Sequence, residues 1–220
     1  MKFNPENLFN LENSVVAPLF NGVENAYEVL PKIGEFIIAL GNSLGSDNYD
    51  KIGENIWIAK TAKVAPTASI TGPCIICDNA EIRHCAFIRG NAFVGPDSVV
   101  GNSTELKNVV LIKKVQVPHY NYVGDSVLGS FSHMGAGAIT SNVKSDKTLV
   151  TVRTDDEIVK TGLKKFGAII GDNVEVGCGS VLNPGTVIGK NSNVYPLSFV
   201  RGYIPENSIY KRLGEVVEKI

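Results

Sequence analysis

The chain has 220 residues, of which 44% are hydrophobic and 20% are charged, and its formal net charge is −1. This is a globular composition, so it excludes a wholly disordered chain. The charge balance gives no overall basic excess of the kind that binds nucleic acid or an anionic membrane. No apolar run reaches the ~20 residues of a membrane span, and the first residues lack the pattern of a signal peptide. We therefore expect a cytoplasmic protein whose four cysteines stay reduced.

The first fifty residues are predicted to be helical. Helical stretches are expected at about 15–20 and 24–40, with breaks near Asn21-Gly22 and at Pro31. We expect residues 1–50 to form a small helical cap over the open end of the repeat structure that follows, because repeat arrays need their ends covered. A helix pair that docks onto a partner protein is the alternative.

Residues 51–207 carry a repeat of six residues. Neither a helix of 3.6 residues per turn nor the alternation of a strand produces this period. A parallel β-helix does, because each hexapeptide supplies a short strand with one inward aliphatic residue and a bend that favours small residues. The sequence therefore predicts an all-β solenoid. The repeated aliphatic positions are Ile52, Ile58, Val64, Ile70, Ile76, Ile82, Ile88, Val94, Val100, Leu106 and Ile112, then Ile170, Val176, Leu182, Ile188, Val194 and Val200.

The repeat is interrupted at 118–122 and again at about 143–167, where a polar, charged segment is inserted. Solenoids accommodate insertions as loops on one face, and such loops often form the binding face. We therefore look for function at these two places. After the repeats, residues 208–220 are predicted to end the chain with a short helix.

Three segments near the interruptions resemble a known family in order, spacing and residue type. They are 105–107, 117–125 and 135–142. The family is the bifunctional glucosamine-1-phosphate N-acetyltransferase / N-acetylglucosamine-1-phosphate uridylyltransferase, and the resemblance is to its acetyltransferase domain, over about 52–212. It implies a left-handed parallel β-helix, assembled as a homotrimer with sites between subunits. Fifty N-terminal residues are too few for the family's nucleotide-transferring domain, so uridylyl transfer is not expected.

The resemblance implies transfer of the acetyl group of acetyl-CoA to an amino-sugar phosphate such as glucosamine 1-phosphate, with no metal required. His119 matches the general base, and an imidazole with a pKa of ~6.5 suits that role near neutral pH. Glu105 matches the carboxylate that orients the base. Fixed positive charge suits a phosphate group. The positions that match substrate-binding residues are Arg89, Lys107, Tyr122, His133, Asn142 and Lys165.

One substrate position departs from the family. His133 stands where the family has an asparagine that contacts the sugar, and a neutral imidazole offers fewer donors than an amide. The identity of the sugar therefore stays open, and a second proton-transfer role for His133 is an alternative. For the coenzyme, the backbone amide of Ala136 matches the contact to the thioester oxygen. Cys178 and Arg212 are the other candidate coenzyme residues.

Two other classes of function compete with this reading. The gamma-class carbonic anhydrases use the same solenoid and bind a metal through three histidines. This chain has His84, His119 and His133, but the nearest two are 14 positions apart, unlike that family. The pair Cys74 and Cys77 has a metal-like spacing without a second pair, so no zinc site is expected. A non-catalytic binding or oligomerisation scaffold is the remaining alternative.

Overall fold

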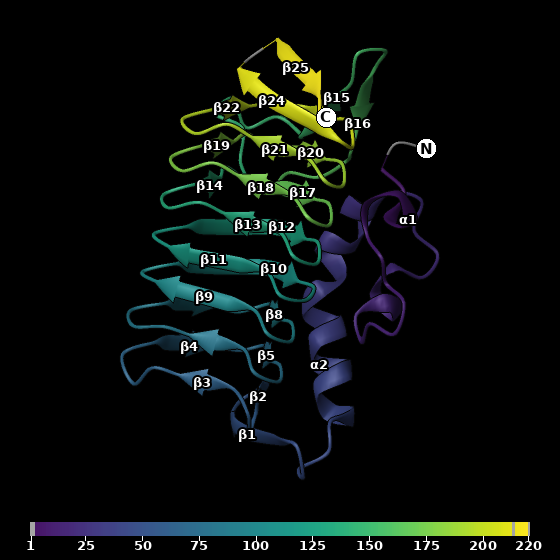
Figure 1. Cartoon of the computed structure of the whole chain (residues 1–220). Helices are drawn as coiled ribbons and strands as arrows, with labels where there is room; N and C mark the ends of the chain where they lie inside the picture. The colour runs from purple at the N-terminus through teal and green to yellow at the C-terminus, as the bar shows by residue number, and fades with distance from the viewer. Residues whose placement is uncertain (1–2, 213, 220) are drawn as a thin grey trace.

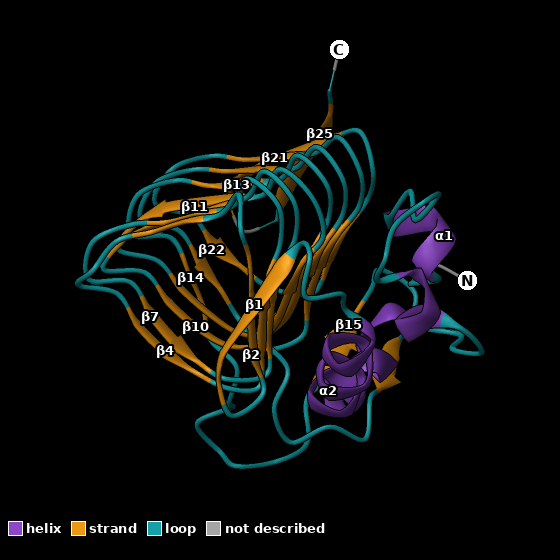
Figure 2. Ribbon diagram, turned by 90° about the horizontal axis from the view of Figure 1, so that it is seen from below, coloured by secondary structure: helices purple, strands orange, loops and turns teal. Residues whose placement is uncertain are grey.

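The computed structural model describes residues 3–212 and 214–219. Its main body is a stack of coils, each built from short strands joined by corners, and the cross-section is a triangle with three faces (Figures 1 and 2). Successive coils pair in parallel, as between Cys74 and Ala92, one coil of 18 residues later. The fold matches a left-handed β-helix, so the predicted solenoid class is confirmed.

Each face of the solenoid contains its own set of short strands. The first face contains β2 (Ile56–Ala59), β5 (Cys74–Ile76), β8 (Ala92–Val94), β17 (Ala168–Ile170), β20 (Thr186–Ile188) and β23 (Tyr203–Ile204). The second contains β4 (Ser69–Thr71), β7 (Phe87–Arg89), β14 (Ile139–Thr140), β19 (Val181–Leu182) and β22 (Phe199–Val200). The third contains β3 (Lys63–Val64), β6 (Glu81–Ile82), β9 (Val99–Asn102), β11 (Gln116–His119), β13 (His133–Met134), β18 (Glu175–Val176), β21 (Asn193–Val194) and β24 (Ser208–Arg212).

Two longer strands continue around the corner from the second face to the first. They are β10 (Glu105–Leu111) and β12 (Tyr122–Leu128). The start of β10 pairs with β7, and its end pairs with β8. Because β10 and β12 pair along their whole length, they join two faces into one sheet in the middle of the solenoid.

Most of the repeated aliphatic residues lie in the interior, as the repeat predicts. Three positions of the repeat are corrected. Val64 is exposed in β3, the last strand of the third face. The step between inward residues shortens to five after Leu106, so Leu111 fills the interior and Ile112 packs outside it. Ile52 is exposed, because it lies in β1 (Tyr49–Gly53), which pairs antiparallel with β2 at the end of the stack.

The N-terminal helices lie along the first face instead of capping the open end (Figure 1). They are α1 (Pro5–Leu8), η1 (Ala17–Phe20), η2 (Ala26–Lys32) and α2 (Ile33–Ser43). The reason is the composition of that face, whose outward side chains Ile75, Phe93 and Val110 are apolar. These residues share a second buried cluster with Ile33 and Ile37. Covering this surface removes it from water, which is the main driving force for packing.

The insertion packs on the same side. It forms an antiparallel hairpin of β15 (Thr151–Arg153) and β16 (Ile158–Lys160), and it buries Val150, Val152 and Phe166 in the outer cluster. No helix in the described part of the chain is long and apolar enough to cross a membrane.

The predicted C-terminal helix is wrong. Residues Ser208–Arg212 form β24, which extends the third face by pairing with β21, and β25 (Glu215–Glu218) pairs antiparallel with β24. Tyr210 is buried at the end of the interior. The segment is a hairpin because its backbone continues the sheet of the last coil, a tertiary contact that outweighs local helix propensity. Residues 213 and 220 lie outside the described part.

Candidate active site

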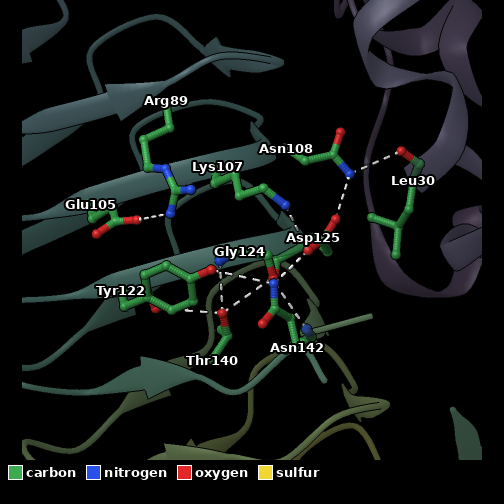
Figure 3. A network of polar contacts seen from close by, with 12 residues as sticks. Leu30, Arg89, Glu105, Lys107, Asn108, Tyr122, Gly124, Asp125, Thr140 and Asn142 are labelled. Carbon is green, nitrogen blue, oxygen red and sulfur yellow. Dashed lines mark hydrogen bonds and ion pairs between the residues drawn. The ribbon is translucent and has the colours of Figure 1, made fainter. Parts of the chain in front are cut away.

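Most of the residues predicted to bind the sugar phosphate gather on the second face (Figure 3). Glu105 at the start of β10 is in register with Phe87 on one side and Tyr122 on the other. Alternation along the strand turns Leu106 into the core and leaves its neighbours Glu105 and Lys107 outside. Arg89, Lys107, Tyr122 and Asn142 are thereby brought together from positions far apart in the sequence, and we call these four residues the phosphate-side cluster.

Arg89 and Glu105 form an ion pair with 2.6 Å between Nη1 and Oε1. Both side chains are partly exposed. The hydrogen bond and charge of Glu105 raise the pKa of Arg89, so the guanidinium stays charged. Burial is the main cause that raises the pKa of Tyr122, so its hydroxyl stays protonated at neutral pH. The amide of Asn142 donates to that hydroxyl at 3.3 Å.

An acidic residue for which the sequence analysis predicts no role lies beneath this cluster. The Asp125 carboxylate accepts from Asn142 Nδ2 at 2.5 Å and from Asn108 Nδ2 at 2.9 Å. It also lies 3.6 Å from Lys107 Nζ. Its side chain is only 7% exposed. Asp125 belongs to the segment that carries the family resemblance, but only the contacts show what it touches.

His119 ends β11 at the corner between the third and second faces, where it is exposed. Its imidazole makes no hydrogen bond with any described residue. The expected contact with Glu105 is not formed, since Glu105 pairs with Arg89. His119 is instead fixed through its backbone. Its N–H donates to Asn121 Oδ1 at 3.1 Å, and its carbonyl accepts from Gly137 N–H at 3.0 Å.

The corner of the next coil presents a free amide beside His119. Ala136 is exposed, and its N–H donates to no described residue. The buried amide of Asn121 donates to the carbonyls of Gly135 at 2.8 Å and Ala138 at 3.0 Å, which holds the two corners together. Gly137 adopts φ +69°, a conformation that favours glycine. His119 and the Ala136 amide are therefore neighbours at one edge of the solenoid.

His133 lies on the third face, away from the phosphate-side cluster. Its Nδ1 is 2.7 Å from Glu175 Oε2 on the adjacent strand β18. The pair borders a pocket of about 510 Å³ that also contains Gly135, Cys178 and Lys219. A side chain on Gly135 would meet the backbone nitrogen of Cys178 at 2.7 Å, so the coils approach closely there.

The two remaining predicted residues, Lys165 and Arg212, lie outside the phosphate-side cluster and the His119 corner. Lys165 is exposed beside Phe166, whose N–H donates to the Asn142 carbonyl at 3.0 Å, so it borders the phosphate-side cluster. Arg212 pairs with Glu215 at 2.6 Å near the C-terminal end. Strands β13, β18 and β21 separate it from β11, which corresponds to about 20 Å at the usual strand spacing. Residues 3–212 and 214–219 contain no group of three or more possible metal ligands.

Comparison with known proteins supports the family resemblance. Residues 70–164 match the model of the GMPPB C-terminal domain, and residues 167–202 match that of the bacterial transferase hexapeptide (six repeats). The bifunctional protein GlmU of Methanococcus aeolicus is 37% identical over 118 residues, which are 54% of this chain and 28% of that protein.

A second relative is the bifunctional sugar-1-phosphate nucleotidylyltransferase/acetyltransferase of Sulfurisphaera tokodaii. It is 32% identical over 109 residues, 50% of this chain and 27% of that protein. The chain thus spans less than a third of the length of these relatives. Among solved structures, a hexapeptide transferase family protein from Anaplasma phagocytophilum is 17% identical and has a TM-score of 0.44, covering 74% of this chain and 78% of that one.

These matches confirm the resemblance predicted from the sequence. Residues 167–202 carry the hexapeptide repeat, and the chain is similar to the bifunctional enzymes to which the three segments pointed.

Proposed function

We propose that the protein is an acetyl-CoA-dependent N-acetyltransferase that acts on an amino-sugar phosphate, with glucosamine 1-phosphate the first acceptor to try. One observation carries the proposal. The exposed imidazole of His119 and the unengaged amide of Ala136 lie side by side at one corner, and that corner adjoins the face that carries Arg89 and Lys107. A base, an oxyanion donor and a cationic cluster are the groups that acetylation of an amino-sugar phosphate needs.

The phosphate-side cluster supplies recognition. Lys107 and Arg89 provide positive charge for the phosphate, and Arg adds a planar fork of donors. Tyr122 and Asn142 offer a hydroxyl and an amide to phosphate or sugar oxygens. Lys165 borders the cluster and adds a further cation.

The chemical step is direct attack of the amine on the thioester. The nitrogen forms a bond to the carbonyl carbon, and His119 accepts the proton that the amine loses. Negative charge develops on the carbonyl oxygen, where the Ala136 N–H donates a hydrogen bond. The C–S bond then breaks, and the coenzyme A thiolate leaves and takes up a proton. General base catalysis typically contributes ~10²–10⁴-fold in rate.

The coenzyme would lie along the third face. The pocket beside Gly135 and Cys178 adjoins the corner that holds Ala136, and Lys219 lines the same pocket. A cation there suits the coenzyme phosphates, and Arg212 lies further along the same sheet. We further propose a homotrimer, in which the corner of one subunit faces the phosphate-side cluster of the next.

The test is release of free thiol from acetyl-CoA in the presence of glucosamine 1-phosphate. His119→Ala should lower kcat by about 10²–10⁴-fold, because the general base is removed. His84→Ala is the matched control. His84 is also exposed and occupies the same corner two coils before His119, about 10 Å away at the usual strand spacing. Its Nδ1 lies 2.9 Å from Thr67 Oγ1, and its carbonyl accepts from Asn102 Nδ2 at 3.0 Å.

Two results would reject parts of this proposal. Full activity in His119→Ala would remove the histidine from the mechanism. No acetylation of any amino-sugar phosphate by the native chain would reject the substrate class and favour a binding scaffold.

A further inference from the structure

Asp125 lies at a corner that is one residue shorter than the equivalent corner between β7 and β8, two coils earlier. Gly90 and Asn91 together turn the chain from β7 to β8, whereas Asn108 alone makes this turn within β10 and Asp125 alone within β12. Asn108 and Asp125 have φ values of +52° and +48°. Residues of this type tolerate the left-handed conformation best after glycine. The tight corner therefore places an amide and a carboxylate directly under the phosphate-side cluster.

The Asp125 carboxylate has a defined set of partners. One oxygen accepts from Asn108, and the other accepts from Asn142 and lies 3.6 Å from Lys107 Nζ. A carboxylate that is 7% exposed costs free energy unless it is paired and hydrogen-bonded. These contacts satisfy it, and each of them also fixes a donor. Two of the fixed side chains, Lys107 and Asn142, are the ones assigned to substrate.

The same carboxylate is tied to the N-terminal helices. Asn108 Nδ2 donates both to Asp125 Oδ1 and to the carbonyl of Leu30, at 3.1 Å, in η2 (Figure 3). Leu30 itself is buried between the helices and the first face. A path of direct contacts thus leads from the helical segment through Asn108 and Asp125 to Lys107.

We propose that Asp125 is the positioning residue of the sugar-phosphate site, and that the N-terminal helical segment holds it in place through Asn108. Asp125 does not touch substrate. It sets the direction of Lys107 and Asn142 before substrate arrives, which lowers the ordering cost of binding. The inference rests on the proposed function, because it assigns Lys107 and Asn142 to the acceptor.

The experiment uses Asp125→Asn in the full chain. Asparagine keeps the size and the left-handed backbone, but its NH₂ group replaces an acceptor and meets the donors of Asn142 or Lys107. We expect KM for glucosamine 1-phosphate to rise about 10- to 100-fold, the usual effect of losing charge-assisted hydrogen bonds. KM for acetyl-CoA should stay unchanged. Asn108→Gly, which suits the positive φ and deletes the amide, should raise the same KM by a smaller factor.

Asp172→Asn is the matched control. Asp172 is also buried and also joins the N-terminal segment to the solenoid, since it accepts from the backbone N–H groups of Asn10 and Ser130, both at 2.6 Å. It touches no residue of the phosphate-side cluster. This variant should lose thermal stability and keep the native KM values.

Three outcomes test the positioning role of Asp125. A selective rise in the sugar-phosphate KM with Asp125→Asn and Asn108→Gly supports the inference. The inference is overturned, and the proposed function stands, if the native enzyme is active but Asp125→Asn has the native KM for the sugar phosphate. The same holds if Asp125→Asn changes this KM no more than Asp172→Asn does. A native chain that acetylates no amino-sugar phosphate overturns the proposed function as well.

Discussion

The contact between His133 and Glu175 raises the question whether His133 transfers protons. Its ring is held by the carboxylate at 2.7 Å on the third face, where it borders the proposed coenzyme pocket. A histidine oriented by a carboxylate is the arrangement used for proton transfer. Here, however, His119 and not His133 adjoins the Ala136 amide, because Gly137 donates to the His119 carbonyl. We therefore propose that His119 transfers the proton and that His133 serves as a contact residue.

The variant His133→Asn tests this assignment. We expect kcat to stay near the native value and KM for the acceptor to change by less than about 10-fold, because an asparagine still offers a donor and an acceptor. Steady-state kinetics with several amino-sugar phosphates provides the measurement. If kcat instead falls by ~10² or more, as general acid-base catalysis would require, His133 takes part in proton transfer.

The sequence could identify site residues by type and order, but it could not assign their contacts. Arg89, Lys107, Tyr122 and Asn142 were all predicted, and they do lie together. The pairing of Glu105 with Arg89 depends on which outward side chains of adjacent coils face each other. Glu105 is in register with Phe87, 18 residues earlier, yet its carboxylate bonds to Arg89, two residues further along β7. The period predicts the register but not which neighbouring side chain the carboxylate reaches.

Close packing of the coils makes one glycine beside the site irreplaceable. A Cβ on Gly101 in β9 would overlap the backbone of Pro118 in β11, the residue before His119. Gly101→Ala must therefore shift Pro118 or separate the coils. We expect it to lower the free energy of unfolding by about 1–3 kcal/mol, and to lower kcat because His119 moves with its strand. Urea denaturation and thiol release measure the two effects.

Gly45→Ala is the control for this variant, because a Cβ at Gly45 would meet no atom within 4 Å. It should unfold and turn over like the native chain. If Gly101→Ala matched it in both measurements, the close approach of β9 and β11 would not be what positions His119.

The placement of the N-terminal helices is not predicted by the six-residue repeat. The six-residue step follows the inward residues and correctly predicts the interior. It ignores the outward residues, and on the first face these are Trp57, Ile75 and Phe93, all buried under the N-terminal segment. Outward apolar residues on consecutive coils are the sequence signal for a covered flank. The C-terminal hairpin left no such signal, because β24 is fixed by its pairing with the preceding coil.

The arrangement of the whole chain leaves a particular edge uncovered. Helices and the inserted hairpin cover the first face, so the second face, the third face and the corner between them remain exposed (Figure 2). That corner carries His119, and it also exposes the apolar side chains of Tyr120 and Leu197. Exposed apolar residues beside a proposed site favour contact with another protein surface. A cyclic homotrimer would seat this edge against the second face of the next copy.

Mixing two inactive variants tests whether each site is shared between subunits. His119→Ala removes the base and Lys107→Ala removes a phosphate contact, so each protein alone should be nearly inactive. If one subunit supplies His119 and its neighbour supplies Lys107, co-expressed chains form some sites with both residues intact. Random assembly into trimers should then restore about a quarter of the native activity. Sedimentation checks that the mixed assemblies are trimers, and a mixture of trimers with no recovered activity would place both residues in the same subunit.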